Sequence, residues 1–345
     1  MALFGRKDPT PLDGVDVVLA DLDGVVYAGP GAIPHAVESL NRAESEGRKI
    51  GFITNNASRT DASVAQHLAD LGLHTVAEDV VTSPQAAVAL LAQKVPAGST
   101  VLVVGGEGLV VELEKAGYVV TRSADDSPAA VLQGFNPDVS WTHLAEAAYA
   151  LKTPEAEGGI PWIATNTDWT IPRERGIAPG NGTLVSAVHT AVGRLATVAG
   201  KPEAPIFHAA TKRFGAKKPL FIGDRLDTDI QGAQAAGMAS ALVLTGIDRP
   251  KQVLAAPSHS RPTYIVGDLR DLFEPYPEVK QRNGVTTVGS AKIRTSDGPQ
   301  IEILDEGDSQ LNLLRAGAHA IWSTGRAIFG FNVPEILYRD TFHRQ

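Results

Sequence analysis

Residues 15–24 read VDVVLADLDG, and this stretch decides the fold. The apolar run at 15–20 predicts a buried strand, because strands covered on both faces are short and almost continuously apolar. The run stops at once in two carboxylates, Asp21 and Asp23, and Gly24 allows a tight turn directly after them. The stretch therefore predicts a buried strand with two aspartates at its carboxyl end.

Other parts of the chain repeat this pattern. Three further apolar runs predict buried core strands, at residues 49–53, 220–222 and 240–244. Residues 34–46 predict a helix between the first two strands, with Pro34 in its first turn and Gly47 at its end. A strand, a helix and a strand in that order imply a parallel sheet covered by helices. We expect an α/β fold with a Rossmann-like parallel-sheet core.

The length of 345 residues predicts about two domains. The stretch from Arg59 to Lys201 is much longer than one crossover, which needs roughly a dozen residues. It therefore predicts an inserted α/β cap domain. Beyond the core, runs at 285–288 and 300–304 predict strands, and 308–328 predicts a helix. We expect core segments at 1–97 and 194–275, the cap at 98–193, and a small α+β C-terminal extension at 276–345.

The composition excludes several kinds of chemistry and partner. The chain has no cysteine, which excludes disulfides, thiolate metal sites and cysteine nucleophiles. Its net charge of −8 argues against nucleic acid or anionic lipid as the main partner. It shows neither an apolar run of about 18 residues nor the apolar stretch of a signal peptide. We expect a cytoplasmic protein that does not insert into membranes.

Polar residues come directly after the predicted core strands. Open parallel sheets bind ligands at this place, outside the carboxyl ends of their strands. Asp21 and Asp23 suit Mg²⁺, which takes oxygen ligands, and also suit a nucleophile with an acid/base partner. The alternative is an ordinary surface turn. Thr54, Asn55 and Asn56 suit an anion cradle at a strand end, and the alternative there is a helix cap.

Two more motifs follow in the second half of the chain. Lys201, between Gly200 and Pro202, is a compact charge suited to phosphate, although a single lysine is usually solvated surface. Asp224 suits a cation site, and Asp229 suits orientation of a lysine or of metal-bound water. The alternative for both is an acidic turn that caps the next helix.

The ordered motifs DxD, TNN, GKP and GD(x)4D together resemble the haloacid dehalogenase superfamily of phosphotransferases. The match is to its branch of 4-nitrophenylphosphatase, phosphoglycolate and pyridoxal phosphatases. That branch carries its cap between the second and third motifs, where the long insertion lies in this chain. The resemblance implies an enzyme, a phosphoric monoester hydrolase that uses Mg²⁺.

The resemblance also implies a role for each motif. Asp21 is the expected nucleophile, and Asp23 the general acid and then the general base. The expected Mg²⁺ ligands are Asp21, the backbone carbonyl of Asp23, and Asp224, with Asp229 supporting them. The residues expected to hold phosphoryl oxygens are Thr54, Asn55, Asn56 and Lys201.

Substrate selection is expected in the cap, where Asn166 and Asp168 lie in the loop nearest the expected cleft. Asp168 suits hydrogen bonds from polyol hydroxyls, and the alternative is an aspartate that stiffens its loop or caps a helix. Over its whole length the chain resembles actinobacterial members of this branch, whose core is followed by a C-terminal extension. That resemblance implies glycerol 3-phosphate as the substrate, with phosphoglycolate or pyridoxal phosphate as alternatives.

The C-terminal extension leaves two rival functions open. One is a metabolite-binding regulator that signals through the extension. The other is acyl transfer, although the extension lacks the glycine-rich pyrophosphate loop of acyl-CoA enzymes. A structural role, or one in forming a homo-oligomer, is the favoured hypothesis for residues 276–345.

Overall fold

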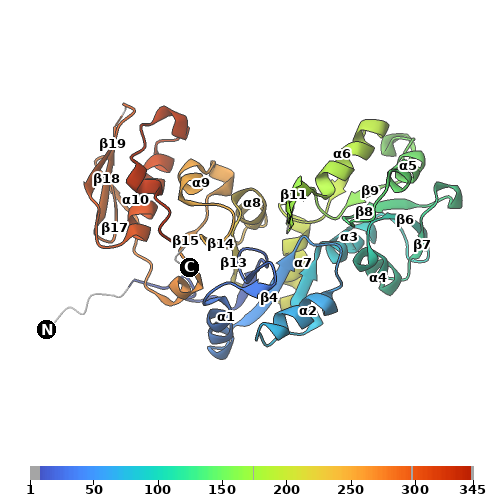
Figure 1. The fold of residues 1–345 in the computed structure, drawn as a ribbon, viewed down its shortest axis with the longest axis horizontal. Coiled ribbons are helices and arrows are strands. Elements are labelled where there is room, and N and C mark those ends of the chain that lie inside the picture. Colours follow the sequence, from blue (N-terminus) through green and yellow to red (C-terminus); the bar gives the residue numbers. More distant parts are fainter. Residues whose placement is uncertain (1–7, 174, 297, 343–345) are drawn as a thin grey trace. The chain divides into compact units, whose positions relative to one another are not determined.

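The computed structural model describes residues 8–173, 175–296 and 298–342 (Figure 1). The chain separates into two compact units: unit 1 is Met1–Ile50 with Ala216–Gln345, and unit 2 is Gly51–Gly215. Each contains parallel strands connected by helices, which confirms the predicted α/β class. The limits of unit 2, residues 51 and 215, differ from the limits of 98 and 193 predicted for the cap. The cap limits stay a prediction.

Within unit 1, four strands pair in parallel in the order β15-β14-β13-β1. They are β1 (Val17–Ala20), β13 (Pro219–Gly223), β14 (Ala239–Val243) and β15 (Tyr264–Val266). The first three confirm the strands predicted there. Nearly every residue of these strands is buried, as their continuous apolar runs require.

The predicted first helix is present as α1 (Ala36–Ser45), but it begins later than expected. Its N-cap, His35, has a positive φ of 66°, so Pro34 precedes the helix instead of lying in its first turn. Gly47 follows the last turn as predicted, and its N–H donates to the carbonyl of Glu44. The remaining short elements of this part are β2 (Tyr27–Ala28), β3 (Gly31–Ala32), α8 (Gln231–Ala235) and α9 (Pro250–Ala255).

The C-terminal extension is an α+β segment within unit 1, as predicted. Its four antiparallel strands lie in the order β16-β17-β18-β19, and helix α10 (Gln310–Ser323) packs on β17 and β18. The strands are β16 (Lys280–Arg282), β17 (Val285–Val288), β18 (Ala291–Thr295) and β19 (Ile301–Asp305). The helix is shorter than the predicted 308–328.

Unit 2 has two groups of parallel strands. β4 (Lys49–Thr54), which enters the unit at Gly51, pairs with β5 (Val80–Thr82). A five-stranded sheet has the order β12-β9-β8-β6-β7. Its strands are β6 (Thr100–Val104), β7 (Val119–Thr121), β8 (Ala130–Gln133), β9 (Trp162–Ala164) and β12 (Thr197–Val198). β12 lies beyond residue 193, so this sheet uses a strand outside the predicted cap.

Six α-helices, three short 3-10 helices and one hairpin complete unit 2 within the described residues. The helices are α2 (Asp61–Asp70), α3 (Ser83–Leu91), α4 (Glu107–Lys115), α5 (Trp141–Ala150), α6 (Asn181–Val192) and α7 (Ala204–Phe214). β10 (Thr170–Arg173) and β11 (Gly176–Pro179) form the antiparallel hairpin. Across the described part of the chain, each helix is too short or too polar to cross a membrane.

Candidate active site

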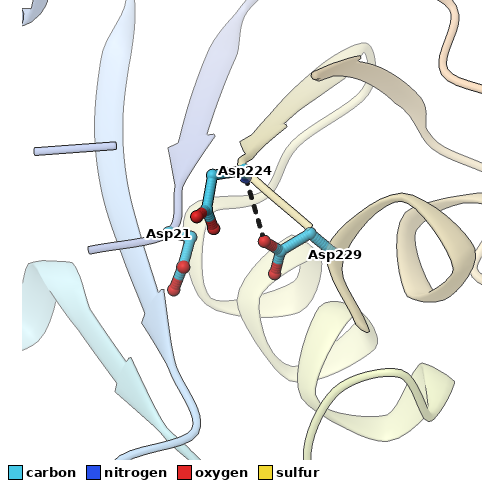
Figure 2. Close-up of side chains that lie close together, drawn as sticks. All are labelled: Asp21, Asp224 and Asp229. Carbon is cyan, nitrogen blue, oxygen red and sulfur yellow. Dashed lines mark hydrogen bonds between the residues drawn. The ribbon is translucent and has the colours of Figure 1, made fainter. Parts of the chain in front are cut away.

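Three aspartates of unit 1 lie together where two paired strands end (Figure 2). Asp21 follows β1 and Asp224 follows β13, and the N–H of Asp21 donates to the Ile222 carbonyl at 2.8 Å. One carboxylate oxygen from each of Asp21, Asp224 and Asp229 lies within 4.8 Å of the other two. The parallel register of β1 and β13 therefore brings together carboxylates that are far apart in the sequence.

Asp229 holds the turn after β13 through its own carboxylate. It lies on a π-helical turn (Leu226–Ile230), and its Oδ2 accepts from the backbone N–H of Asp224 at 3.1 Å (Figure 2). The same oxygen accepts from the N–H of Arg225 at 3.2 Å. This oxygen accepts from two backbone donors of the turn, and the supporting role at the metal site stays a prediction for Asp229.

A neighbouring loop fixes the carboxylate of Asp224. The N–H of Ile247 donates to its Oδ2 at 2.7 Å, and the N–H of Asp248 donates to its carbonyl at 3.1 Å. Asp248 in turn accepts from the N–H of Leu226 at 2.6 Å, and burial raises the pKa of Asp248. Backbone N–H groups thus help to fix the position of Asp224.

Two glycines allow the chain to approach this carboxylate closely. A Cβ at Gly24 or at Gly246 would overlap the side chain of Asp224, and Gly24 also has a φ of +82°. The hydroxyl of Thr245 donates to the Gly24 carbonyl at 2.7 Å and joins the two turns.

The three carboxylates fit a hard divalent cation. Asp21, Asp224 and Asp229 are 8%, 1% and 0% exposed, so their charges are poorly screened and repel one another. A cation with oxygen ligands, such as Mg²⁺, removes that repulsion. Asp23 is exposed and its side chain is outside the cluster, while its predicted metal contact, through the backbone carbonyl, stays a prediction.

The predicted phosphate residues lie in unit 2, where the TNN motif begins at Thr54, the last residue of β4. Thr54 is buried and its hydroxyl accepts from the N–H of Asn56 at 3.1 Å. The side chain of Asn56 accepts from the N–H and hydroxyl of Ser58, at 2.9 and 2.7 Å. The next helix, α2, is capped instead by Thr60. The motif therefore shapes a turn, and the alternative of a helix cap is wrong.

Asn55 is the centre of a hydrogen-bond network around Lys201. Its Oδ1 accepts from the N–H of Lys201 at 2.8 Å, and its Nδ2 donates to the Lys201 carbonyl at 3.0 Å. The same Nδ2 lies 3.2 Å from both carboxylate oxygens of Asp168. The side-chain amide thus positions a buried lysine and a loop aspartate. The predicted contact of Asn55 with a phosphoryl oxygen stays a prediction.

Sequence reasoning missed one partner of this network, Ser83, which begins α3 and is fully buried. Its hydroxyl donates to the Asn55 carbonyl at 2.8 Å. The available signal was a serine directly after an apolar strand, a position that also suits an ordinary helix start.

Asn166 and Asp168 contact their own loop and Asn55. The Nδ2 of Asn166 donates to the Asn55 carbonyl at 2.8 Å, and its Oδ1 accepts from the N–H of Asp168 at 3.2 Å. Asn181 donates to the Asn166 carbonyl at 2.7 Å. Contact with substrate stays a prediction for both residues, and so does the loop-stiffening alternative for Asp168.

Comparison with known proteins relates this chain to a family of hydrolases. Residues 18–119 match the family described as haloacid dehalogenase-like hydrolase, and residues 198–272 match a second HAD-like hydrolase family. The chain is 41% identical to the D-glycerol 3-phosphate phosphatase of Mycobacterium tuberculosis, covering 90% of this chain and 87% of that protein. It is 38% identical to human chronophin, covering 74% and 92%.

Solved structures agree with the sequence matches. The crystal structure of a glycerol phosphate phosphatase from M. tuberculosis in complex with magnesium has a TM-score of 0.83 at 40% identity, and 94% of each chain is covered. A 4-nitrophenylphosphatase from Thermotoga maritima has a TM-score of 0.70 at 26% identity, covering 76% of this chain and 98% of that one.

Replacing Gly246 by Ala tests whether the close turn shapes the cation site. The new Cβ would displace the Asp224 carboxylate, so we expect Mg²⁺ binding, measured by calorimetry, to weaken about tenfold. Gly31→Ala is the matched control, because a Cβ there meets no atom within 4 Å. Equal affinities in the two variants would contradict the role of Gly246.

Replacing Asn55 by Asp tests the network around Lys201. The change places a carboxylate against that of Asp168 and removes the donor to the Lys201 carbonyl, so we expect kcat/KM for phosphate release to fall about 10- to 100-fold. The double variant Asn55→Asp/Asp168→Asn restores an amide–carboxylate pair and should recover part of the loss. No recovery in the double variant would contradict the proposed pairing.

Proposed function

Because the chain belongs to the haloacid dehalogenase-like hydrolases, we propose that it is a Mg²⁺-dependent phosphatase that hydrolyses glycerol 3-phosphate to glycerol and phosphate. The observation that carries the proposal is the cluster of Asp21, Asp224 and Asp229 at the ends of β1 and β13. The substrate is that of the M. tuberculosis relative, with which 90% of this chain aligns.

In the proposed reaction Asp21 is the nucleophile. Its carboxylate oxygen attacks phosphorus, the bond from phosphorus to the ester oxygen breaks, and Asp23 gives its proton to the departing alkoxide. Asp23, now a carboxylate, takes a proton from water, which attacks the aspartyl-phosphate and releases phosphate. The exposed side chain of Asp23 and the fixed backbone of Asp21 support these two roles.

Charge neutralisation decides whether this attack is feasible, because a carboxylate and a phosphate dianion repel each other. We assign Mg²⁺ binding to Asp21, Asp224 and the Asp23 carbonyl, with Asp229 in support. A bound Mg²⁺ supplies positive charge next to the phosphoryl group. Thr54, Asn55, Asn56 and Lys201 are the proposed phosphate-binding residues, and the contacts of Asn55 support an indirect role through Lys201.

We assign substrate selection to the cap proposed at 98–193 and to the loop with Asn166 and Asp168. The alternatives of phosphoglycolate and pyridoxal phosphate differ from glycerol 3-phosphate in shape and charge, and a Staphylococcus aureus relative 32% identical is an acid sugar phosphatase. Relatives with one fold therefore act on different small phosphomonoesters.

We also place the protein in the cytoplasm and propose a small phosphorylated metabolite, not nucleic acid, as its partner. The net charge of −8 supports the exclusion of nucleic acid. The proposed homo-oligomer is tested by light scattering of the purified chain. The rival regulator would bind its metabolite without releasing phosphate in the presence of Mg²⁺.

The nucleophile is tested by Asp21→Asn, which keeps the shape of the side chain but removes the attacking carboxylate. We expect phosphate release to fall at least about 1,000-fold while the circular dichroism spectrum stays that of the wild type. Wild-type turnover in this variant would overturn the mechanism. Chelation of Mg²⁺ should abolish the activity of the wild type, and added Mg²⁺ should restore it.

A substrate panel tests the preference for glycerol 3-phosphate. Release of phosphate from glycerol 3-phosphate, phosphoglycolate, pyridoxal phosphate and a hexose phosphate is compared as kcat/KM. We expect glycerol 3-phosphate to lead by about tenfold or more. The Asp21→Asn protein serves as the blank for contaminating phosphatases. A higher kcat/KM for another compound would replace the proposed substrate but leave the proposed chemistry intact.

A further inference from the structure

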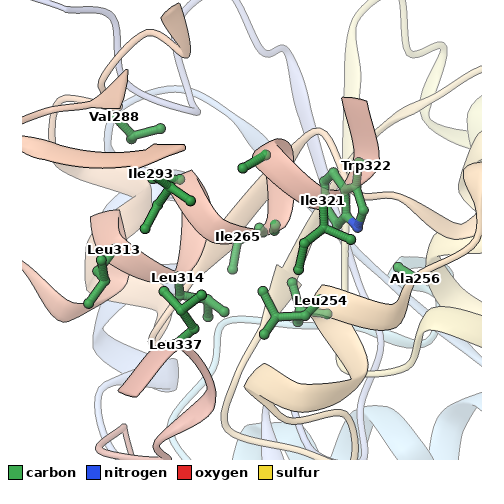
Figure 3. Close-up of a cluster of buried hydrophobic side chains, with 14 of the residues drawn as sticks. Leu254, Ala256, Ile265, Val288, Ile293, Leu313, Leu314, Ile321, Trp322 and Leu337 are labelled. Atoms are coloured by element: carbon green, nitrogen blue, oxygen red, sulfur yellow. The ribbon is translucent and has the colours of Figure 1, made fainter. Parts of the chain in front are cut away.

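The C-terminal extension shares one hydrophobic core with α9, β15 and the π-helical turn that carries Asp229. Figure 3 shows the part of this core between the extension, α9 and β15. This core joins apolar side chains from both sides of residue 276. From the segments before the extension it contains Leu226, Ile230, Leu242, Leu244, Val253, Leu254 and Ile265. From the extension it contains Val288, Ile293, Leu313, Leu314, Ile321, Trp322 and Leu337, among others.

Helix α10 is fixed against α9 and β15 by polar as well as apolar contacts. Arg315, which is 5% exposed, donates from Nε and Nη2 to the carbonyl of Ile265 at 2.9 and 2.7 Å. At Gly317 the helix backbone is so close that a Cβ would lie 3.3 Å from Leu337 and 3.5 Å from Leu254. Leu337 therefore lies at the junction of α10 and α9.

The segment 244–249 connects this shared core to Asp224. It begins at Leu244, which is fully buried in the core, and leads directly into α9. Between these anchors, Ile247 donates its N–H to the carboxylate of Asp224. Arg249 donates to the Leu244 carbonyl at 3.3 Å and pairs with Asp340 of the extension at 3.7 Å.

The π-helical turn that carries Asp229 has the same support. Leu226 and Ile230, the first and last residues of this turn, both belong to the shared core. A shift of the extension would thus be transmitted to the loops on which Asp224 and Asp229 depend.

We propose that the C-terminal extension is a positioning element of the divalent-cation site. It fixes α9 and the segment 244–249, and these hold the Asp224 carboxylate in its ligating position. The inference rests on the Mg²⁺ site of the proposed function. It assigns to residues 276–345 a role in cation affinity. On this view the extension is not an independent module that can be removed without affecting the phosphatase core.

The test compares two truncations within the shared core of the full-length protein. Leu337→Ala removes a buried side chain at the α9 junction, and Ile293→Ala removes one of similar size from β18, on the strand side of α10. Calorimetry with Mg²⁺, below the melting temperature of both variants, should show an affinity about fivefold weaker for Leu337→Ala and near that of the wild type for Ile293→Ala. Equal affinities would overturn the proposal.

A second pair of variants leaves the core intact, in case the truncations do not fold. Asp340→Asn removes the partner of Arg249, and Glu302→Gln removes an exposed carboxylate that pairs with Arg294 at 2.9 Å. Both changes alter the net charge equally, so a difference between the two variants does not come from net charge. We expect Mg²⁺ affinity to fall about twofold in Asp340→Asn only. Matching affinities in this pair would count against the proposal.

Two further measurements separate this inference from the proposed function. Asp224→Asn should abolish calorimetric Mg²⁺ binding, which identifies the site being measured. Absence of Mg²⁺ binding in the wild type would overturn the cation site itself, and the positioning role with it. Normal Mg²⁺ binding without phosphate release would instead overturn the proposed activity and leave the role of the extension standing.

Discussion

The parallel pairing of β1 with β13 is the constraint on which the rest of the structure depends. Its register sets Ala20 beside Ile222, so the next polar residues on each strand, Asp21 and Asp224, meet at one edge. Two nearly buried carboxylates at this distance repel each other unless a cation or fixed donors compensate. The surrounding turns supply the donors, and the oxygen ligands suit Mg²⁺.

Backbone N–H groups help to maintain this arrangement. A peptide N–H is a rigid donor, and no side-chain entropy is lost when it makes a hydrogen bond. Asp224 accepts one such hydrogen bond from the N–H of Ile247. This support explains why a segment far along the chain matters to the aspartates. Leu244, directly before the loop, belongs to the same core as α10, so packing in the C-terminal extension bears on the geometry of the acidic cluster.

In unit 2 the positioning group is a side-chain amide, whereas at Asp224 it is a backbone N–H. Asn55 offers a donor and an acceptor in one plane, which matches the N–H and carbonyl of Lys201. An amide that makes hydrogen bonds through both its oxygen and its nitrogen has little freedom to rotate, so it can hold a charged residue in position. The predicted phosphate contact and this observed network assign different tasks to one asparagine, because residue type alone does not reveal which partner it meets.

The sequence by itself determined the α/β class, the core strands β1, β4, β13 and β14, the α+β extension and the acidic residues Asp21 and Asp224 at strand ends. These are local properties, since apolar periodicity and strand termination involve only neighbouring residues. Only the tertiary structure decided that Asn55 pairs with Asp168 and Lys201, 113 and 146 residues away, and that Leu337 packs beside α9. Such contacts form when distant segments pack together. Local sequence preferences depend only on neighbouring residues and therefore do not predict them.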